Sequence, residues 1–345
     1  MSERAIFLDE GPGETRAVVT IDGAPERLMI ERAGLDYPRL GARYRARVSR
    51  VDRAVGLAWL DLGPDGGASV RLKNDRAPPR EGQKVEADII IEPQGDKPAV
   101  ARVIDDAEGE PARLAVAPSL EQRLRALAPD APLVTGRAAR DEADEAEAAV
   151  LAVEHNLPGG GSIAIERTRA LTAVDVDLGS ASGEAKRAAR QVNLRAIAEC
   201  ARLLRLGAQG GLVVLDLVGR GHDGQALSHA LKSAFAADQP GVAFGPVSRF
   251  GLVELALPRR LRPLADLLCG PGGAPSADTL ALRLLRAIER QAQADPGGRL
   301  AASAPPLVIA AAGQWAHFLS GRIGARFELK ADPALKPHDI AIRTL

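Results

Sequence analysis

The runs Leu171-Thr-Ala-Val-Asp-Val-Asp177 and Gly210-Gly-Leu-Val-Val-Leu-Asp216 decide the fold of this chain. Each is an apolar, β-branched stretch that ends in aspartate and predicts a buried strand. Residues 184–206 between them predict one amphipathic helix. A strand, a crossover helix and a parallel strand bring both strand ends to one edge of a sheet, where open α/β sheets bind ligands. We therefore expect Asp175 and Asp216 to lie side by side.

Two carboxylates at one sheet edge suit a hard divalent cation. Magnesium takes one or two protein carboxylates and completes its shell with water, and manganese is the alternative ion. Taken alone, Asp175 is better explained as a solvated strand end, but its pairing with Asp216 favours a metal site held by these two residues. Asp177 shares a face with Asp175, because side chains two apart on a strand point the same way.

Composition limits the classes of function. The 345 residues carry 45 basic and 45 acidic side chains, so nucleic-acid binding must rest on local charge. The two cysteines, Cys200 and Cys269, have no metal-ligand spacing, and we expect a buried and a surface thiol in a reducing compartment. The N-terminus lacks a signal-peptide pattern, and no apolar run approaches the ~20 residues of a membrane span. We expect a cytoplasmic protein without a membrane span.

The pattern of elements predicts a multidomain protein of mixed α+β and α/β class. An N-terminal β meander is interrupted by about five short strands that fit an OB-type barrel, and a mixed α/β core and a small α/β domain follow. The expected divisions are residues 1–36 packing with 105–156, the barrel at 37–104, the core at 157–268 and the last domain at 276–345.

Three local expectations concern the linker and the tail. The acidic stretches 105–110 and 141–147 read as exposed helices. In the tail, residues 307–311 read as a strand and 314–319 as a helix. Two further strands are expected there, at 325–330 and 340–342.

The first barrel strand has a basic face. Arg43, Arg45 and Arg47 alternate along it, and a barrel with one basic face is a common surface for single-stranded nucleic acid. Trp59 is the one aromatic residue placed to stack a base. A solvated charge run and a barrel-core tryptophan are the alternatives. The full set of candidate residues for binding single-stranded nucleic acid is Arg43, Arg45, Arg47, Trp59, Lys97, Arg249, Arg260 and Arg262.

The sequence Gly219-Arg-Gly-His-Asp-Gly224 offers a competing interpretation. It is a G-x-G-x-x-G motif between a predicted strand and a predicted helix, the context of a dinucleotide-binding loop. Asp216 would, however, place a negative charge close to the pyrophosphate, and no strand ends in an acidic residue about 20 positions later. We interpret these glycines as a loop beside the metal site. The five scattered histidines suggest no catalytic role.

Several motifs, in order along the chain, resemble the ribonuclease E/G family. Residues 157–177 resemble its segment LP-GG-I-I-TEALTAIDVN, and residues 203–216 resemble QLRLRDLGGLIVIDF. Residues 248–254 and 260–263 match SRFGLLE and RLRP. The segments at 14–16, 41–51, 327–335 and 339–342 are similar to the family's meander, barrel and C-terminal domain.

This resemblance implies a magnesium-dependent endoribonuclease that cuts single-stranded RNA and leaves a 5′ phosphate and a 3′ hydroxyl. It implies that Asp175 and Asp216 hold the ion, and that Asp177 stands where the family has an asparagine that orients the site. The catalytic set is therefore Asp175, Asp177 and Asp216.

The chain departs from the family pattern at several positions. Cys269-Gly-Pro-Gly stands where the family has a zinc-binding C-P-x-C pair, and one thiol per chain cannot complete a four-ligand site between subunits. We therefore expect no zinc and no zinc-linked tetramer, and a homodimer stays an open alternative. Residues 135–137 are a remnant of the family's sensor for an RNA 5′ monophosphate, and Ser69 replaces a barrel aromatic.

Two other functions stay open. The departures from the family pattern leave open a catalytically weak RNA-binding or regulatory protein of the same fold. The G-x-G-x-x-G motif from Gly219 to Gly224 leaves open a dinucleotide-dependent enzyme.

Overall fold

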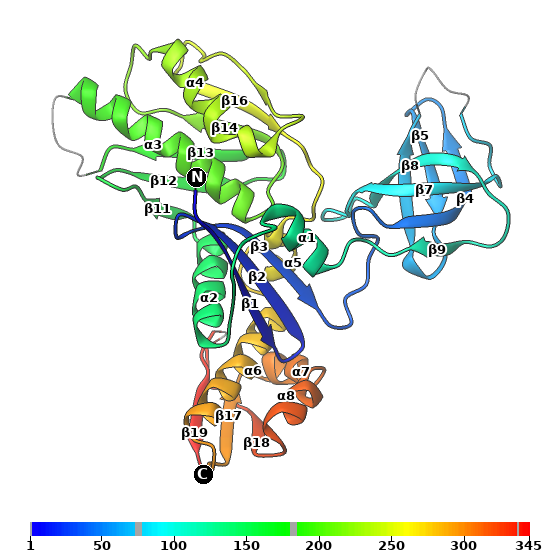
Figure 1. Ribbon diagram of the computed structural model, residues 1–345, viewed down its shortest axis with the longest axis vertical. Helices are drawn as coiled ribbons and strands as arrows, with labels where there is room; N and C mark the ends of the chain where they lie inside the picture. The colour runs from blue at the N-terminus through cyan, green and yellow to red at the C-terminus, as the bar shows by residue number, and fades with distance from the viewer. Residues whose placement is uncertain (1, 73–77, 180–184, 337) are drawn as a thin grey trace.

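The computed structural model describes residues 2–72, 78–179, 185–336 and 338–345, arranged in three lobes around a central sheet (Figure 1). The central sheet is the predicted meander, in the order β10-β1-β2-β3. Its strands are β1 (Arg4–Gly11), β2 (Glu14–Ile21), β3 (Ala24–Arg32) and β10 (Leu133–Thr135), and the helices beside it are α1 (Leu120–Leu127) and α2 (Arg137–Leu151).

The lobe at the right of Figure 1 is a closed five-stranded barrel, consistent with an OB-like fold. Strands β4 and β5 close it by pairing with each other, and the short β9 adds to the outside of β4. The elements are β4 (Arg43–Asp52), β5 (Leu57–Asp61), η1 (Gly63–Asp65), β6 (Gly67–Arg71), β7 (Lys84–Ile91), β8 (Ala99–Asp106) and β9 (Ala112–Ala115). Alternating residues such as Tyr44, Val48 and Leu60 fill the interior.

The upper lobe is the α/β core, a six-stranded mixed sheet in the order β11-β12-β13-β14-β16-β15 (Figure 1). Its elements are β11 (Glu154–Asn156), β12 (Ser162–Arg167), β13 (Thr172–Asp177), α3 (Ala185–Leu206), β14 (Gly211–Asp216), α4 (Gly224–Ala234), η2 (Ala236–Asp238), β15 (Ala243–Phe244), β16 (Leu252–Leu257) and α5 (Leu264–Leu268). Among hydrogen-bonded neighbours in this sheet, β13 and β14 form the parallel pair, and helix α3 joins them as a crossover. The predicted start of that helix, Glu184, lies outside the described residues.

The lower lobe is a small α/β domain with the sheet order β18-β17-β19. Its elements are α6 (Ala277–Ala294), β17 (Leu300–Ala304), α7 (Pro306–Ala312), α8 (Ala316–Ile323), β18 (Phe327–Ala331) and β19 (Ala341–Thr344). None of the described helices is long and apolar enough to span a lipid bilayer.

Three expectations were wrong. Residues 307–311 form helix α7 rather than a strand, because Pro306 begins a helix and the alanine-rich run continues it. Residues 105–106 end strand β8, and an irregular segment with a bend follows where we expected a helix. The stretch 141–147 is helical but not wholly exposed, since Glu147 is 2% exposed.

Glu147 is buried within a cluster of four arginines and four carboxylates that joins the meander, α2 and α6. Arg16 donates to Asp9 at 2.6 Å and to Glu147 at 2.9 Å. Arg286 of α6 contacts Glu14 and Glu147. We call this the arginine cluster, and its members are Asp9, Glu14, Arg16, Arg32, Arg140, Glu147, Arg286 and Glu289, all less than 9% exposed.

Candidate active site

The structure places Asp175 and Asp216 directly beside each other. They are register partners on the parallel strands β13 and β14. Neighbouring strands lie about 4.8 Å apart. Both residues are exposed, although their strands lie at the middle of the sheet. The 41-residue separation in sequence is therefore closed by one crossover, as expected.

The two carboxylates point away from the helices. Val174, Val176 and Leu215 alternate with them along the strands and are buried in the core that α3 and α4 complete. Because side chains alternate across a strand, Asp175 and Asp216 lie on the opposite, open face of the sheet. Hydrophobic packing of one face thus fixes the orientation of both acids.

Asn193 of α3 holds the chain just beyond Asp216. Its amide donates to the Val218 carbonyl at 2.9 Å and accepts from the Val218 amide at 3.1 Å. Asn193 is 2% exposed, so this pair of bonds is shielded from water. Sequence reasoning missed this residue, although a polar side chain next to Val192 on the apolar stripe of the helix was a usable signal.

Asp177 lies on the same face as Asp175, two strand positions beyond the register position that ends β14. Its Oδ1 accepts a hydrogen bond from the Gly179 amide at 2.5 Å. The residue therefore adds a third negative charge near the pair while its carboxylate also stabilises the following turn.

The carboxylate pair fits magnesium and does not fit zinc. Among the described residues, no group of three or more His, Cys, Asp or Glu side chains could hold a metal ion. Two exposed carboxylates are a sufficient protein contribution for magnesium, which keeps several waters, whereas structural zinc takes four nitrogen or sulfur ligands. Cys200 is buried and Cys269 half-buried, and both are free thiols.

A cleft of about 1190 Å³ opens beside Asp216. Its walls are the loop 219–224, helix α4 and residues 244–251. Three cations line it, Arg220, Lys232 and Arg249, while Asp216 is the one acid among the described residues of the lining. The cleft therefore places three cations beside Asp216, whereas Asp175 is not among its lining residues.

His222 also lines this cleft, although no histidine was expected at the site. Its Nε2 is buried without a hydrogen-bond partner among the described residues. A Cβ at Gly251 would approach that atom to 3.3 Å, so the ring packs closely against the glycine. The G-x-G-x-x-G loop supplies this histidine, and Asp223 caps α4 by accepting from the Ala226 amide at 3.0 Å. The capped helix end favours our interpretation of the loop over a dinucleotide site.

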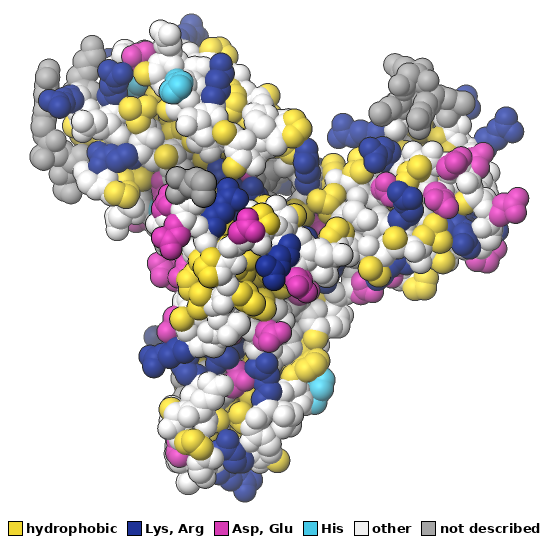
Figure 2. Space-filling model, in the orientation of Figure 1, with side chains coloured by type: hydrophobic (Ala, Val, Ile, Leu, Met, Phe, Trp, Pro, Cys, Tyr) yellow, Lys and Arg dark blue, Asp and Glu magenta, His cyan; other side chains and the backbone are white. Residues whose placement is uncertain are grey.

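The predicted basic face of the barrel is largely balanced by acids. Arg43 donates to Asp88 at 2.8 Å. Glu86 is the cross-strand partner of Arg45, and Arg47 lies between Lys84 and Asp61. Figure 2 shows basic and acidic side chains interspersed over this lobe.

Trp59 lies on the outside of the barrel rather than in its core. It is half-buried, and the Arg50 guanidinium lies 5.0 Å from its ring centroid. Its cross-strand neighbour is Ser69, which stands where the ribonuclease E/G pattern has a second barrel aromatic. Lys97 is exposed in the turn that bridges back to Gln94.

The barrel joins the core through the buried side chain of Glu92. Its carboxylate accepts from the Leu40 amide at 3.1 Å and from the Arg262 amide at 2.8 Å. Its own amide donates to the Arg260 carbonyl at 2.9 Å. The guanidinium of Arg262 lies 5.6 Å from the Tyr37 ring centroid. The RLRP segment therefore forms part of this joint.

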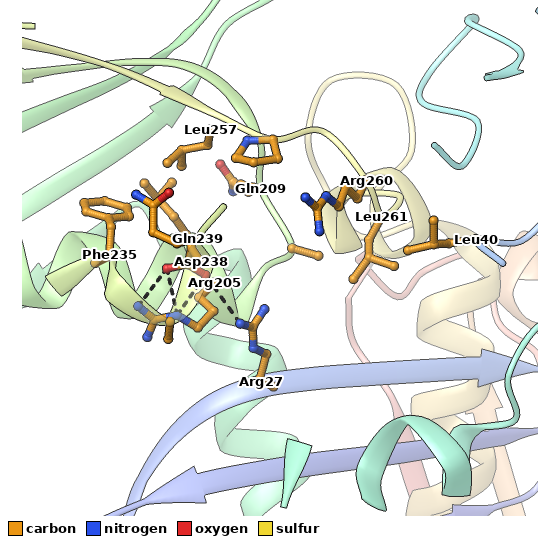
Figure 3. Close-up of a pocket in the computed structure, with 15 residues that line it drawn as sticks. Arg27, Leu40, Arg205, Gln209, Phe235, Asp238, Gln239, Leu257, Arg260 and Leu261 are labelled. Atoms are coloured by element: carbon orange, nitrogen blue, oxygen red, sulfur yellow. Dashed lines mark hydrogen bonds and ion pairs between the residues drawn. The ribbon is translucent and has the colours of Figure 1, made fainter. Parts of the chain in front are cut away.

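Arg260 also lines a second, smaller cavity of about 220 Å³ (Figure 3). Asp238 there accepts from Arg205 at 2.9 Å and contacts Arg27 at 3.4 Å. The lining of this cavity does not include Asp175 or Asp216. Of the arginines predicted near the core, only Arg249 lies in the cleft beside Asp216.

Residues 111–260 match the model of the ribonuclease E/G family. The chain carries a ribonuclease E/G segment. It holds Asp175, Asp177, Asp216, Arg249 and the cleft, so the resemblance seen in the sequence is confirmed for this part. The barrel and the C-terminal lobe lie outside the match.

Curated relatives share the ribonuclease E/G segment. Ribonuclease E of Escherichia coli K12 is 35% identical over 150 residues, covering 40% of this chain and 14% of that protein. Ribonuclease E of Buchnera aphidicola from Acyrthosiphon pisum is 36% identical over 151 residues, covering 39% and 16%. Ribonuclease G of Salmonella typhimurium is 26% identical over 192 residues, covering 51% and 39%. The chain thus spans well under half the length of each of these proteins.

Proposed function

We propose that the protein is an endoribonuclease that hydrolyses single-stranded RNA with magnesium held by Asp175 and Asp216. The observation that carries the proposal is the register pairing of these two exposed carboxylates on the open face of the sheet. The names of the relatives that share the ribonuclease E/G segment support it. Two free thiols are consistent with the cytoplasm as its place of action.

In this proposal, water attacks a phosphorus of the RNA backbone and the bond from phosphorus to the 3′ oxygen breaks. The attacking water loses a proton to solvent, the leaving oxygen gains one, and the products carry a 5′ phosphate and a 3′ hydroxyl. A bound magnesium ion would supply charge stabilisation at the phosphoryl oxygens and an acidified water. Manganese is the alternative ion.

The residues of the chain would orient the substrate. Arg220, Lys232 and Arg249 line the cleft that adjoins Asp216 and would contact backbone phosphates on the way to the carboxylates. Asn193 would keep the end of β14 in place through its two bonds to Val218. The barrel would add contacts through Trp59, Lys97 and Arg47, while Arg43 and Arg45 are already engaged with other groups of the barrel.

The test is magnesium-dependent cleavage of a 5′-labelled single-stranded RNA by Asp175→Asn and Asp216→Asn. We expect each variant to lose at least about 100-fold in rate, since an amide does not supply the ligand charge. Asp130→Asn, at an exposed position on the loop after α1, is the matched control and should cut like the parent. Equal rates for all four proteins would refute the assignment of roles.

A second candidate is a catalytically weak RNA-binding protein. The observation that favours it is the third carboxylate, Asp177, which stands on the face of the metal pair and is engaged with the Gly179 amide. RNA binding that persists without turnover under magnesium and manganese would support this candidate. Restoration of cleavage by Asp177→Asn would show that the third charge is the cause.

A further inference from the structure

The cleft beside Asp216 has an aromatic side chain at its mouth. Phe250 is 72% exposed although it lines the cleft together with Asp216 and three cations. A phenylalanine is rarely left this open, because burying it stabilises a protein by about 1.5–3 kcal/mol. The exposed ring is therefore available for contact with a ligand bound in the cleft.

The turn that carries Phe250 is held firmly by Ser248. The Ser248 hydroxyl accepts from the amides of Phe250 and Leu252, each at 3.2 Å. The Ser248 amide donates to the Leu252 carbonyl at 2.8 Å, and Gly251 completes the turn with a φ of 90°. A left-handed backbone at this point favours glycine. The ring is therefore displayed on a preorganised turn.

Phe250 is also held close to the candidate metal ligands. Leu252, two residues later, is the register partner of Asp216 on the neighbouring strand β16. Two residues of extended chain span only about 7 Å. An RNA whose phosphate lies at the carboxylates would thus place an adjacent base within reach of the ring.

The charges around the ring suit a nucleotide. The Arg249 guanidinium lies 4.7 Å from the Phe250 ring centroid, and no salt bridge engages Arg249, Arg220 or Lys232 within the described part of the chain. A flat aromatic ring beside unpaired cations binds a base by stacking and its phosphates by charge.

We propose that Phe250 and Arg249 form a base-stacking platform for a nucleotide next to the scissile phosphate of single-stranded RNA. The inference rests on the proposed function for the position of the phosphate. It adds a second site of base recognition in the core, separate from Trp59 on the barrel.

The test measures RNA affinity without metal, so that no cleavage interferes. Fluorescence anisotropy in EDTA would compare the parent with Phe250→Ala and Phe250→Tyr. We expect Phe250→Ala to bind single-stranded RNA on the order of 10-fold more weakly, and Phe250→Tyr to retain most of the affinity. Phe318→Ala, another exposed aromatic position in the C-terminal lobe, is the matched control and should bind like the parent.

Abasic substitutions scanned across the cleavage site would identify the stacked nucleotide. At one position, loss of the base should weaken binding to the parent about 10-fold and to Phe250→Ala not at all, because both changes remove the same contact. Additive losses at every position would overturn the proposal. So would an unchanged RNA affinity accompanied by altered sedimentation of Phe250→Ala, which would assign the ring to a protein contact.

The two proposals can fail separately. Coupling between the base and Phe250 without any metal-dependent cleavage would retain the platform and refute hydrolysis. Cleavage that depends on Asp175 and Asp216 without such coupling would retain hydrolysis and refute the platform.

Discussion

Two sets of carboxylates in this protein differ in burial and in their partners. In the arginine cluster, four carboxylates are buried and each contacts at least one arginine. On the open face of the core sheet, Asp175 and Asp216 are exposed, and no arginine or lysine of the described residues forms a salt bridge with them. The first set is neutralised and joins lobes, whereas the second is left available for a cation. The same chemical group is therefore buried and paired in one place and exposed without a cationic partner in the other.

The largest loss of stability should follow from removing one arginine of the arginine cluster. Arg16→Met leaves the carboxylates of Asp9 and Glu147 without one partner each, inside a site from which water is excluded. We expect the free energy of unfolding to fall by about 3–5 kcal/mol. Denaturant unfolding would measure this. Arg137→Met, whose parent side chain is 90% exposed, is the control and should change stability by less than about 0.5 kcal/mol. A similar small loss for Arg16→Met would contradict the comparison.

A smaller loss of stability should follow from mutation of Asn193, which holds the chain just beyond Asp216. Asn193→Leu keeps the volume of the side chain but leaves the amide and carbonyl of Val218 unpaired. We expect a loss of about 1–3 kcal/mol in stability, together with slower RNA cleavage because the end of β14 is no longer held. Gln191→Ala, at an exposed position on the same helix, is the control. Normal cleavage by a destabilised Asn193→Leu would show that the amide has no part in positioning Asp216.

Mutation of the exposed pair, Asp175 and Asp216, should change the free energy of unfolding with the opposite sign. Without metal, Asp216→Asn removes the repulsion between two carboxylates at paired strand positions. Like charges directly opposite each other destabilise a sheet, so the variant should be more stable by about 0.2–1 kcal/mol. Magnesium should raise the melting temperature of the parent and not of the variant. A variant that is less stable than the parent without metal would remove the distinction between the two sets.

The last effect is the loss of stability in acid to which Glu147 should contribute. Burial alone would raise its pKa, but Arg286 and Arg16 outweigh burial and leave the pKa below its ordinary value. A depressed pKa in the folded state gives stability that is present above the unfolded value and lost as the pH falls through the folded one. Stability measured against pH should therefore decline below about pH 4, and Glu147→Gln should flatten that decline. An identical acid profile in Glu147→Gln would exclude this contribution.

Local pattern was sufficient for the strands that carry the candidate site. The β-branched runs ending at Asp177 and Asp216 predicted β13 and β14, and the amphipathic stretch between them predicted a parallel pair, which the register confirms. Five alternating runs likewise predicted the strands of the closed barrel. For each single strand the deciding information lies within about ten consecutive residues, as hydrophobic periodicity requires, whereas the parallel pairing also needed the helix between the two strands.

Features that depend on distant partners were not visible in the sequence. Glu147 appeared exposed within an acidic run, but it is buried against Arg16, 131 residues away. Arg260 and Arg262 stay predicted RNA-binding residues, but the joint that their backbones form with Glu92 was not visible in the sequence. His222 and Phe250 became evident only when the loop at 219–224 and the turn at 248–251 were seen to line one cleft.

The pairing of Asp175 with Asp216 limits how the chain can vary in length. One residue inserted within β14 would invert its alternation and turn the aspartate toward the hydrophobic core. The entry to that strand has little tolerance either, since a Cβ at Gly210 would lie 2.5 Å from the Pro258 carbonyl oxygen. Length changes are better accommodated in the turn at 271–274, where the residues are exposed and remote from the strand pair. Insertions in diverged or engineered forms should therefore accumulate there, and the spacing between helix α3 and Asp216 should remain fixed.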